Sequence, residues 1–172
     1  MAPLRSLGNP DISPFDDVFC ATGKRYNHTY VDKSNNWYGD RGLYAGGTPG
    51  PQNTIDYITI SSTGNATDFG DLYAAHSGVG ALSSGVNGRA VFGGGSGNVD
   101  DMGYVTIGSA GNTSDFGNLT AGRYSPVGVN NTVRGLFCGG AVPSPVNNID
   151  YITTASTGNA QDFGDLVVAR YS

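Results

Sequence analysis

The sequence contains few charged residues and little basic charge. Charged side chains make up 13% of its 172 residues, with nine Lys and Arg against fourteen Asp and Glu, a net charge of −5. Because basic residues are so few, the sequence predicts no positive surface that would bind a phosphate backbone. We therefore expect no nucleic acid partner. No apolar run reaches the length of about 18 residues that a membrane-spanning helix needs. We therefore expect no membrane span.

Residues that commonly carry catalysis or hold metals are also scarce. The two cysteines, Cys20 and Cys138, form neither a disulfide framework nor a CxxC motif, so we expect both to be free. His28 and His76 are the only histidines, and no metal-ligand spacing accompanies them. The G-x-S-x-G turn of hydrolases and the lysine of a P-loop are also missing. The sequence predicts neither an enzyme nor a bound metal or cofactor.

Glycine and tyrosine are abundant instead. The chain has 28 Gly and 10 Tyr, and its polar residues are mostly Asn, Ser and Thr. This composition disfavours long solvent-facing helices and favours many short strands joined by tight turns. We therefore predict an all-β fold.

One segment occurs three times. "IDYITISSTGNATDFGDL" at 55–72 returns as "MGYVTIGSAGNTSDFGNL" at 102–119 and as "IDYITTASTGNAQDFGDL" at 149–166. Tyr57, Tyr104 and Tyr151 are therefore 47 residues apart, from 104 − 57 and 151 − 104. Repeats of about 40 to 50 residues are typical of propellers and solenoids.

The similarity extends upstream, to "RGLYAGG" at 41–47, "RAVFGGG" at 89–95 and "RGLFCGG" at 134–140. We divide the chain into an N-terminal arm at 1–24 and a repeat domain at 25–172. The domain comprises units at 25–72, 76–119 and 123–166 and a terminal strand at 167–172. Each unit is expected to form four strands, in the third unit "YSPVGVN", "RGLFCGG", "NIDYITT" and "DFGDLVVA".

Residues that recur in every unit are assigned to the fold, because a catalytic group is needed only once. Aspartates before the recurring phenylalanines are expected to bind turn amides, and the phenylalanines to pack between sheets. The recurring residues are Gly46, Gly47, Gly94, Gly95, Gly139 and Gly140, then Tyr57, Tyr104 and Tyr151, then Asp68, Phe69, Asp115, Phe116, Asp162 and Phe163.

These units resemble kelch repeats over residues 25–172. The matching features are an Arg at the first strand, an apolar second strand ending in Gly-Gly, a Tyr in the third strand and an aromatic residue in the fourth. The resemblance implies four-stranded propeller blades. Phe in place of the kelch Trp, with the wording "TGNAxDFGDL", is similar to a variant in virion proteins of marine bacteriophages, especially cyanophages. That similarity implies a non-enzymatic virion protein of the tail, fibre or capsid decoration, used for assembly or host attachment.

Three blades are fewer than the about four to eight that close a propeller. We therefore expect the ring to be completed by self-association, with two copies giving six blades, or by other virion proteins. The arm at 1–24 docks on a neighbouring subunit, supplies a strand from residues 15–22 that completes a blade within or between chains, or is a disordered leader.

Ligand binding is expected where the units differ. The variable loops are 47–54, 95–101 and 140–148, and an insertion in the first unit carries the only tryptophan. That tryptophan is either a lid on the first blade or an aromatic platform for a sugar or a protein. The alternative functions are a carbohydrate-binding propeller that takes a host surface glycan and, more distantly, a metal-dependent enzyme. The candidate binding residues are Tyr30, Trp37, Tyr38, Asn53, Asn98, Asp100 and Asn147.

Overall fold

A computed structural model of the chain describes residues 40–84, 88–131 and 133–171. All of them belong to one unit of the chain, which spans Lys33–Ser172. The expected N-terminal arm, the expected first strand of the first repeat, and Tyr30, Trp37 and Tyr38 lie outside the described residues.

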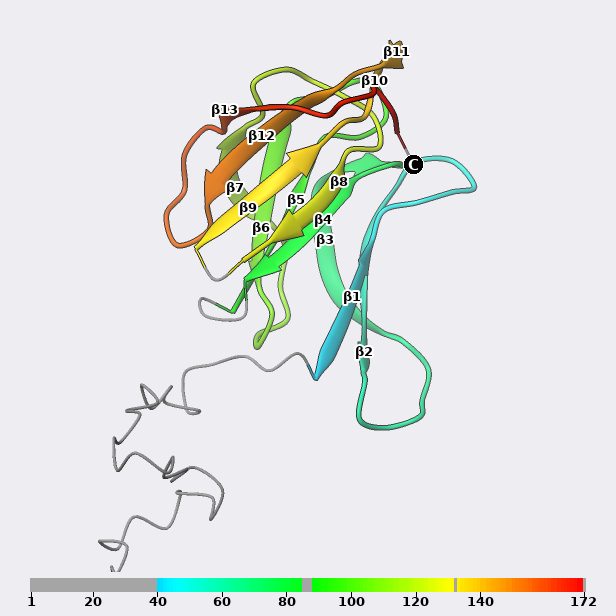
Figure 1. Cartoon of the computed structure of the whole chain (residues 1–172). Helices are drawn as coiled ribbons and strands as arrows, with labels where there is room; N and C mark the ends of the chain where they lie inside the picture. Colours follow the sequence, from blue (N-terminus) through cyan, green and yellow to red (C-terminus); the bar gives the residue numbers. More distant parts are fainter. Residues whose placement is uncertain (1–39, 85–87, 132, 172) are drawn as a thin grey trace, which may run out of the picture. The chain divides into compact units, whose positions relative to one another are not determined.

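The described residues form antiparallel sheets and contain no helix (Figure 1). The first sheet has the order β1-β2-β3, the second β4-β5-β6-β7 and the third β13-β12-β9-β8, and β10 pairs with β11. The strands are β1 (Arg41–Ala45), β2 (Gln52–Thr59), β3 (Thr67–His76), β4 (Gly80–Ser84), β5 (Arg89–Gly93), β6 (Asp101–Thr106), β7 (Ser114–Asn118), β8 (Val127–Asn130), β9 (Arg134–Cys138), β10 (Ala141–Val142), β11 (Ser144–Pro145), β12 (Asn148–Thr153) and β13 (Gln161–Asp165).

The all-β prediction is confirmed over these ranges. The described part of each repeat forms one sheet of three or four strands, and the third repeat adds the β10-β11 pair. The repeats also share one register, because the recurring tyrosine of the third strand always faces the same position of the second strand. The pairs are Leu43 with Tyr57, Val91 with Tyr104 and Leu136 with Tyr151. A register shift follows Ile55, Met102 and Ile149 at equivalent points. Sequence repetition therefore extends to the hydrogen-bond pattern.

The C-terminal segment differs from the expected terminal strand at 167–172. Residues 167–171 form no strand. The backbone groups of Arg170 bind the loop before β12 instead, since Arg170 N donates to Val146 O at 3.2 Å and Gly140 N donates to Arg170 O at 3.0 Å. These hydrogen bonds to the loop take the place of the strand-to-strand hydrogen bonds that a terminal strand would make.

The recurring Gly-Gly pair follows the second strand of each repeat and holds the backbone at or beyond the end of the fourth strand. A Cβ added to Gly94, whose φ is +71°, would lie 2.5 Å from the carbonyl oxygen of Arg123. The amide of Gly95 donates to that same oxygen at 2.9 Å. Gly46 with Gly47 and Gly139 with Gly140 hold His76 O and Arg170 O in the same way. Both the left-handed backbone and the close approach therefore require glycine.

Replacing Gly94 with Ala should destabilise the protein through this close approach. Gly50 is the matched control, because its φ of +72° is nearly the same and nothing lies within 4 Å of an added Cβ. Gly50→Ala carries the left-handed backbone penalty alone, about 1–2 kcal/mol. Gly94→Ala should cost about 1–2 kcal/mol more because the neighbouring backbone must move. Urea unfolding of both variants measures the difference, and equal losses would contradict this account.

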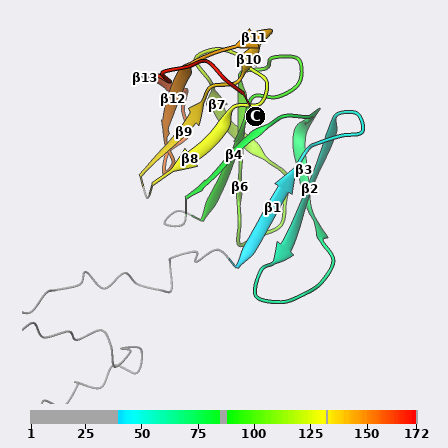
Figure 2. The same ribbon diagram turned by 45° about the vertical axis from the view of Figure 1, so that its right-hand side comes forward.

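The hydrophobic core lies between successive sheets. One cluster joins the first and second sheets and the other joins the second and third, so the middle sheet is covered on both faces (Figure 2). The first cluster contains Ile55, Phe69, Leu72, Ala90, Phe92, Val105 and Ile107. The second contains Leu82, Val91, Met102, Phe116, Leu119, Phe137, Ile152 and Ala160. Each large side chain buried in this way contributes about 1.5–3 kcal/mol.

Candidate functional site

Each pair of successive sheets is joined by the same backbone hydrogen bonds. We call the contact of the first with the second sheet the first junction, and that of the second with the third sheet the second junction. At the first junction Gly111 N donates to Phe69 O at 2.7 Å and Thr113 N to Asp71 O at 2.8 Å. The second junction repeats both bonds, from Gly158 N to Phe116 O at 2.6 Å and from Ala160 N to Asn118 O at 2.8 Å.

An asparagine in the "GN" turn completes each junction. Asn112 Oδ1 accepts from Asp71 N at 3.0 Å, and Asn159 Oδ1 accepts from Asn118 N at 3.1 Å. The turn therefore supplies two backbone donors and one side-chain acceptor to the last strand of the preceding sheet. This strand is β3 at the first junction and β7 at the second. Such directional bonds fix how far one sheet slides along the next.

The recurring Asp-Phe-Gly segment shapes the other half of the junction. Asp115 Oδ1 accepts from Gly117 N at 3.0 Å, and Asp68 and Asp162 bind Gly70 N and Gly164 N at 3.1 Å. A Cβ on Gly117 would lie 2.5 Å from Gly158 O, so the next turn approaches closely only because this residue is glycine. The aspartates thus serve the local backbone.

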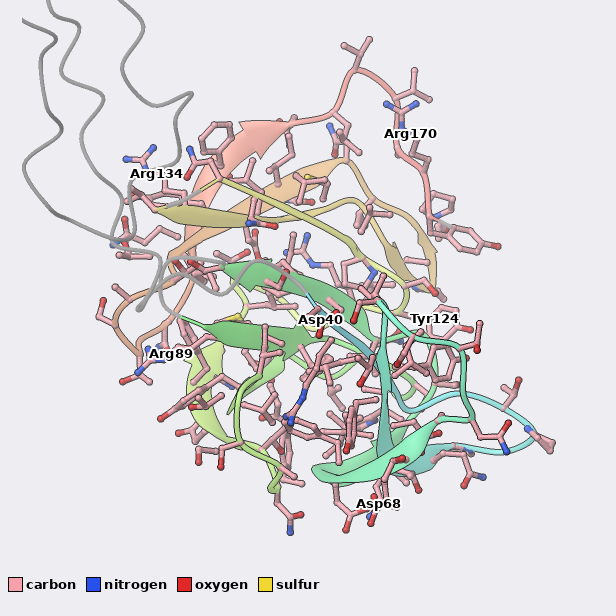
Figure 3. All side chains as sticks on the ribbon, turned by 90° about the horizontal axis from the view of Figure 1, so that it is seen from below. Asp40, Asp68, Arg89, Tyr124, Arg134 and Arg170 are labelled. Carbon is pink, nitrogen blue, oxygen red and sulfur yellow. The ribbon has the colours of Figure 1, made fainter. Side chains whose placement is uncertain are left out.

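A recurring arginine adds hydrogen bonds between the two sheets at the edge of each junction. Arg41 Nη1 donates to Ile107 O at 2.9 Å, and Arg89 Nη1 donates to the carbonyls of Thr154 and Ala155 at 3.3 and 3.0 Å. In Figure 3, Arg89 and Arg134 both lie along one edge of the described sheets. The sequence reasoning assigned no role to these arginines.

The same arginines stack on the recurring tyrosines, which in turn contact the phenylalanines. In the second sheet the Arg89 guanidinium lies 4.5 Å from the centre of the Tyr104 ring, and that ring meets Phe116 edge-on at 6.0 Å between centroids. The other sheets repeat the stack with Arg41, Tyr57 and Phe69 and with Arg134, Tyr151 and Phe163. The tyrosine of each sheet therefore orients the arginine of the same sheet, independently of the contact with the next sheet.

A buried ion pair anchors the connection into the third sheet. Arg123 Nη2 lies 2.5 Å from Asp150 Oδ2, and each side chain is 1% exposed. Thr120 binds the same carboxylate through its hydroxyl at 2.7 Å and its amide at 3.0 Å. Arg123 also donates to the carbonyls of Gly139 and Asn148 at 3.4 and 3.3 Å. This network fixes the connection between β7 and β8. The guanidinium of Arg123 and the carboxylate of Asp150 are both engaged in hydrogen bonds within it.

The candidate binding residues that the structure describes come from three equivalent loops of the repeats. Asn53 is exposed in β2, and Asn98 is exposed in a turn with a φ of +56°. Asp100 and Asn147 use their carbonyl oxygens for the fold, accepting from Leu119 N and Leu166 N at 2.7 Å each. These bonds give the backbone of both residues a role in the fold, whatever their side chains bind.

Two hollows recur beside the "GN" turns. One of about 220 Å³ is lined by residues that include Tyr104 and Asn112, and one of about 240 Å³ by the equivalent Tyr151 and Asn159. The tyrosine rings already carry an arginine each. The ring face that the arginine covers is therefore not available for stacking of a sugar ring.

Titratable groups in the described ranges do not converge on a reaction centre. Burial raises the pKa of the Cys138 thiol, and burial together with a hydrogen bond to Asp101 raises the pKa of Tyr73. Both shifts favour the neutral form. Among residues 40–84, 88–131 and 133–171, no three His, Cys, Asp or Glu side chains are grouped so as to hold a metal ion. The same ranges contain no helix able to cross a membrane.

Comparison with known proteins finds no family model that matches the chain and no match among curated proteins.

Proposed function

We propose that the chain is a non-enzymatic structural protein of a bacteriophage particle. In this proposal its sheets are kelch-like propeller blades that serve protein–protein assembly or host attachment, in the tail, a fibre or the capsid decoration. The observation that supports it most is the sheet junction, which is built twice from equivalent residues, with Gly111 and Asn112 in the first and Gly158 and Asn159 in the second.

At the two junctions the recurring polar residues serve the packing of the sheets. The aspartates bind bulge amides, the arginines bind the next sheet, and the asparagines close the junction. A chain whose polar motif residues hold sheets together provides a scaffold whose variable loops are free to differ. This use of the motif favours a structural role over catalysis.

The assignment to a phage particle rests on the resemblance of the "TGNAxDFGDL" repeat to virion proteins of marine phages. Mass spectrometry of gradient-purified particles of the source phage tests it. We expect peptides of this chain to co-sediment with the major capsid protein and to survive washing that removes host proteins. Absence of the chain from particles in which the capsid protein is abundant would refute the proposal.

A further inference from the structure

The first sheet carries an exposed apolar face whose counterparts elsewhere are buried. Tyr44, Ile58 and Ile60 are 70%, 46% and 60% exposed. Their equivalents in the second sheet are Phe92, Val105 and Ile107, each 3% exposed because the first sheet covers them. We call Tyr44, Ile58, Ile60 and the turn at 63–66 the leading face.

The third sheet carries the opposite half of a junction, also uncovered. Phe163 is 51% exposed, whereas its equivalents Phe69 and Phe116 are 2% exposed. A hollow of about 370 Å³ beside it is lined by Val129, Asn130, Asn131, Arg134, Leu136 and Phe163. We call this hollow with β13 the trailing face. Figures 1 and 2 show β1 and β13 on opposite sides of the middle sheet.

The polar groups on the two faces also correspond to those of a completed junction. The internal junctions pair the "GN" turn with the strand that follows the recurring phenylalanine. By that equivalence Gly64 N faces Phe163 O, Ala66 N faces Asp165 O, and Asn65 Oδ1 faces Asp165 N. Arg134, already stacked on Tyr151 at 4.8 Å, corresponds to Arg89 and would reach Ile60 O.

We propose that the trailing face of one copy docks on the leading face of a second copy, head to tail, through a third junction of the same design. This rests on the proposed structural role, and it specifies the partner, the faces and the register. A second copy is the occupant because each end presents the half that the other lacks. Two copies of three blades give six, within the about four to eight that close a propeller, so the contact forms twice and the assembly is a closed dimer.

The test compares the full chain with Ile58→Asp on the leading face and Phe163→Asp on the trailing face by sedimentation velocity. Wild type should be a dimer. Each variant should raise the dissociation constant at least about 100-fold, because a charge replaces a central apolar contact at both interfaces. Val142→Asp is the matched control, since Val142 is 40% exposed and belongs to neither face. It should remain a dimer.

Mixing the two variants distinguishes a head-to-tail contact from one between identical faces. A mixed dimer keeps one intact interface, formed by the trailing face of Ile58→Asp and the leading face of Phe163→Asp. The 1:1 mixture should therefore recover dimer that neither variant forms alone. The chain that carries both changes should stay monomeric. Raising its concentration should recover no dimer.

Three results would overturn the proposal: a monomeric wild type, a dimer unaffected by either variant, or a mixture that recovers no dimer. Circular dichroism confirms folding of each variant, and Ile60→Asp replaces Ile58→Asp if the latter does not fold. The outcome is separate from that of the proposed function. A head-to-tail dimer of a protein absent from phage particles would keep this inference and refute the virion role, and a monomer found in particles would do the reverse.

Discussion

Replacing Asp150 with Ala should lower the free energy of unfolding by about 3–5 kcal/mol. The substitution leaves the Arg123 guanidinium, 1% exposed, without its carboxylate, and it removes both acceptors of Thr120. A buried charge without its partner pays the desolvation cost with little attraction in return. Urea unfolding followed by circular dichroism measures the loss as a shift in the midpoint at unchanged slope.

The second repeat provides the control for this prediction. There His76 stands at the position of Arg123 and Gly103 at the position of Asp150, so the protein already contains a version of the pair without the carboxylate. His76 Nδ1 lies 3.2 Å from Ser96 O, and its Nε2 has no hydrogen-bond partner among the residues that the structure describes. Arg123→His with Asp150→Gly should therefore cost less than the sum of the two single changes. Additive losses would show that the ion pair contributes no coupling.

The strands could be predicted from the sequence because their signals are local and recur. Gly-Gly and the Asp-Phe-Gly segment each set backbone geometry within a few residues, because their glycines have a positive φ in every repeat. Three aligned copies showed which positions recur, which placed the second, third and fourth strands of each unit. Boundaries were less exact, and β13 ends at Asp165 while the equivalent β3 continues to His76. Strand ends depend on ladder partners that lie far away in the sequence.

The junction contacts could not be predicted, because they join residues far apart in the chain. Asp71 and Asn112 pair over 41 positions, and Arg89 reaches Ala155 over 66. One signal was present in the sequence without being used. The unit that has His76 in place of arginine is also the unit that has Gly103 in place of aspartate, and this joint change indicates that Arg123 contacts Asp150.

The candidate binding residues were chosen on a different ground, and the structure shows a backbone role for two of them. Variable loops were expected to bind ligands because they differ between units. In the structure the carbonyl oxygens of Asp100 and Asn147 accept hydrogen bonds from the amide of the leucine that follows β7 and β13. A backbone role of this kind tolerates any side chain, so ligand binding by these side chains stays a prediction.

The recurring phenylalanine gives the second large effect. Phe116→Ala should cost about 3–5 kcal/mol of unfolding free energy, because the side chain is 2% exposed and its loss leaves a cavity at the second junction. Phe163→Ala removes the same atoms from the same edge-on contact with a tyrosine, since the ring centroids are 6.0 Å apart for Phe116 and 6.1 Å for Phe163. Only the covering sheet differs between the two sites.

At chain concentrations low enough for a monomer, Phe163→Ala should therefore change the unfolding free energy by no more than about 0.5 kcal/mol. Urea unfolding of both variants at several concentrations makes the comparison. As the chain concentration rises and copies associate, the loss of unfolding free energy caused by Phe163→Ala should rise too. Binding of a second copy stabilises the folded chain only where the trailing face is intact. A large loss at Phe163 that does not depend on concentration would mean that this ring is already buried within the single chain. Equal small losses at both sites would instead show that packing between sheets contributes little to stability.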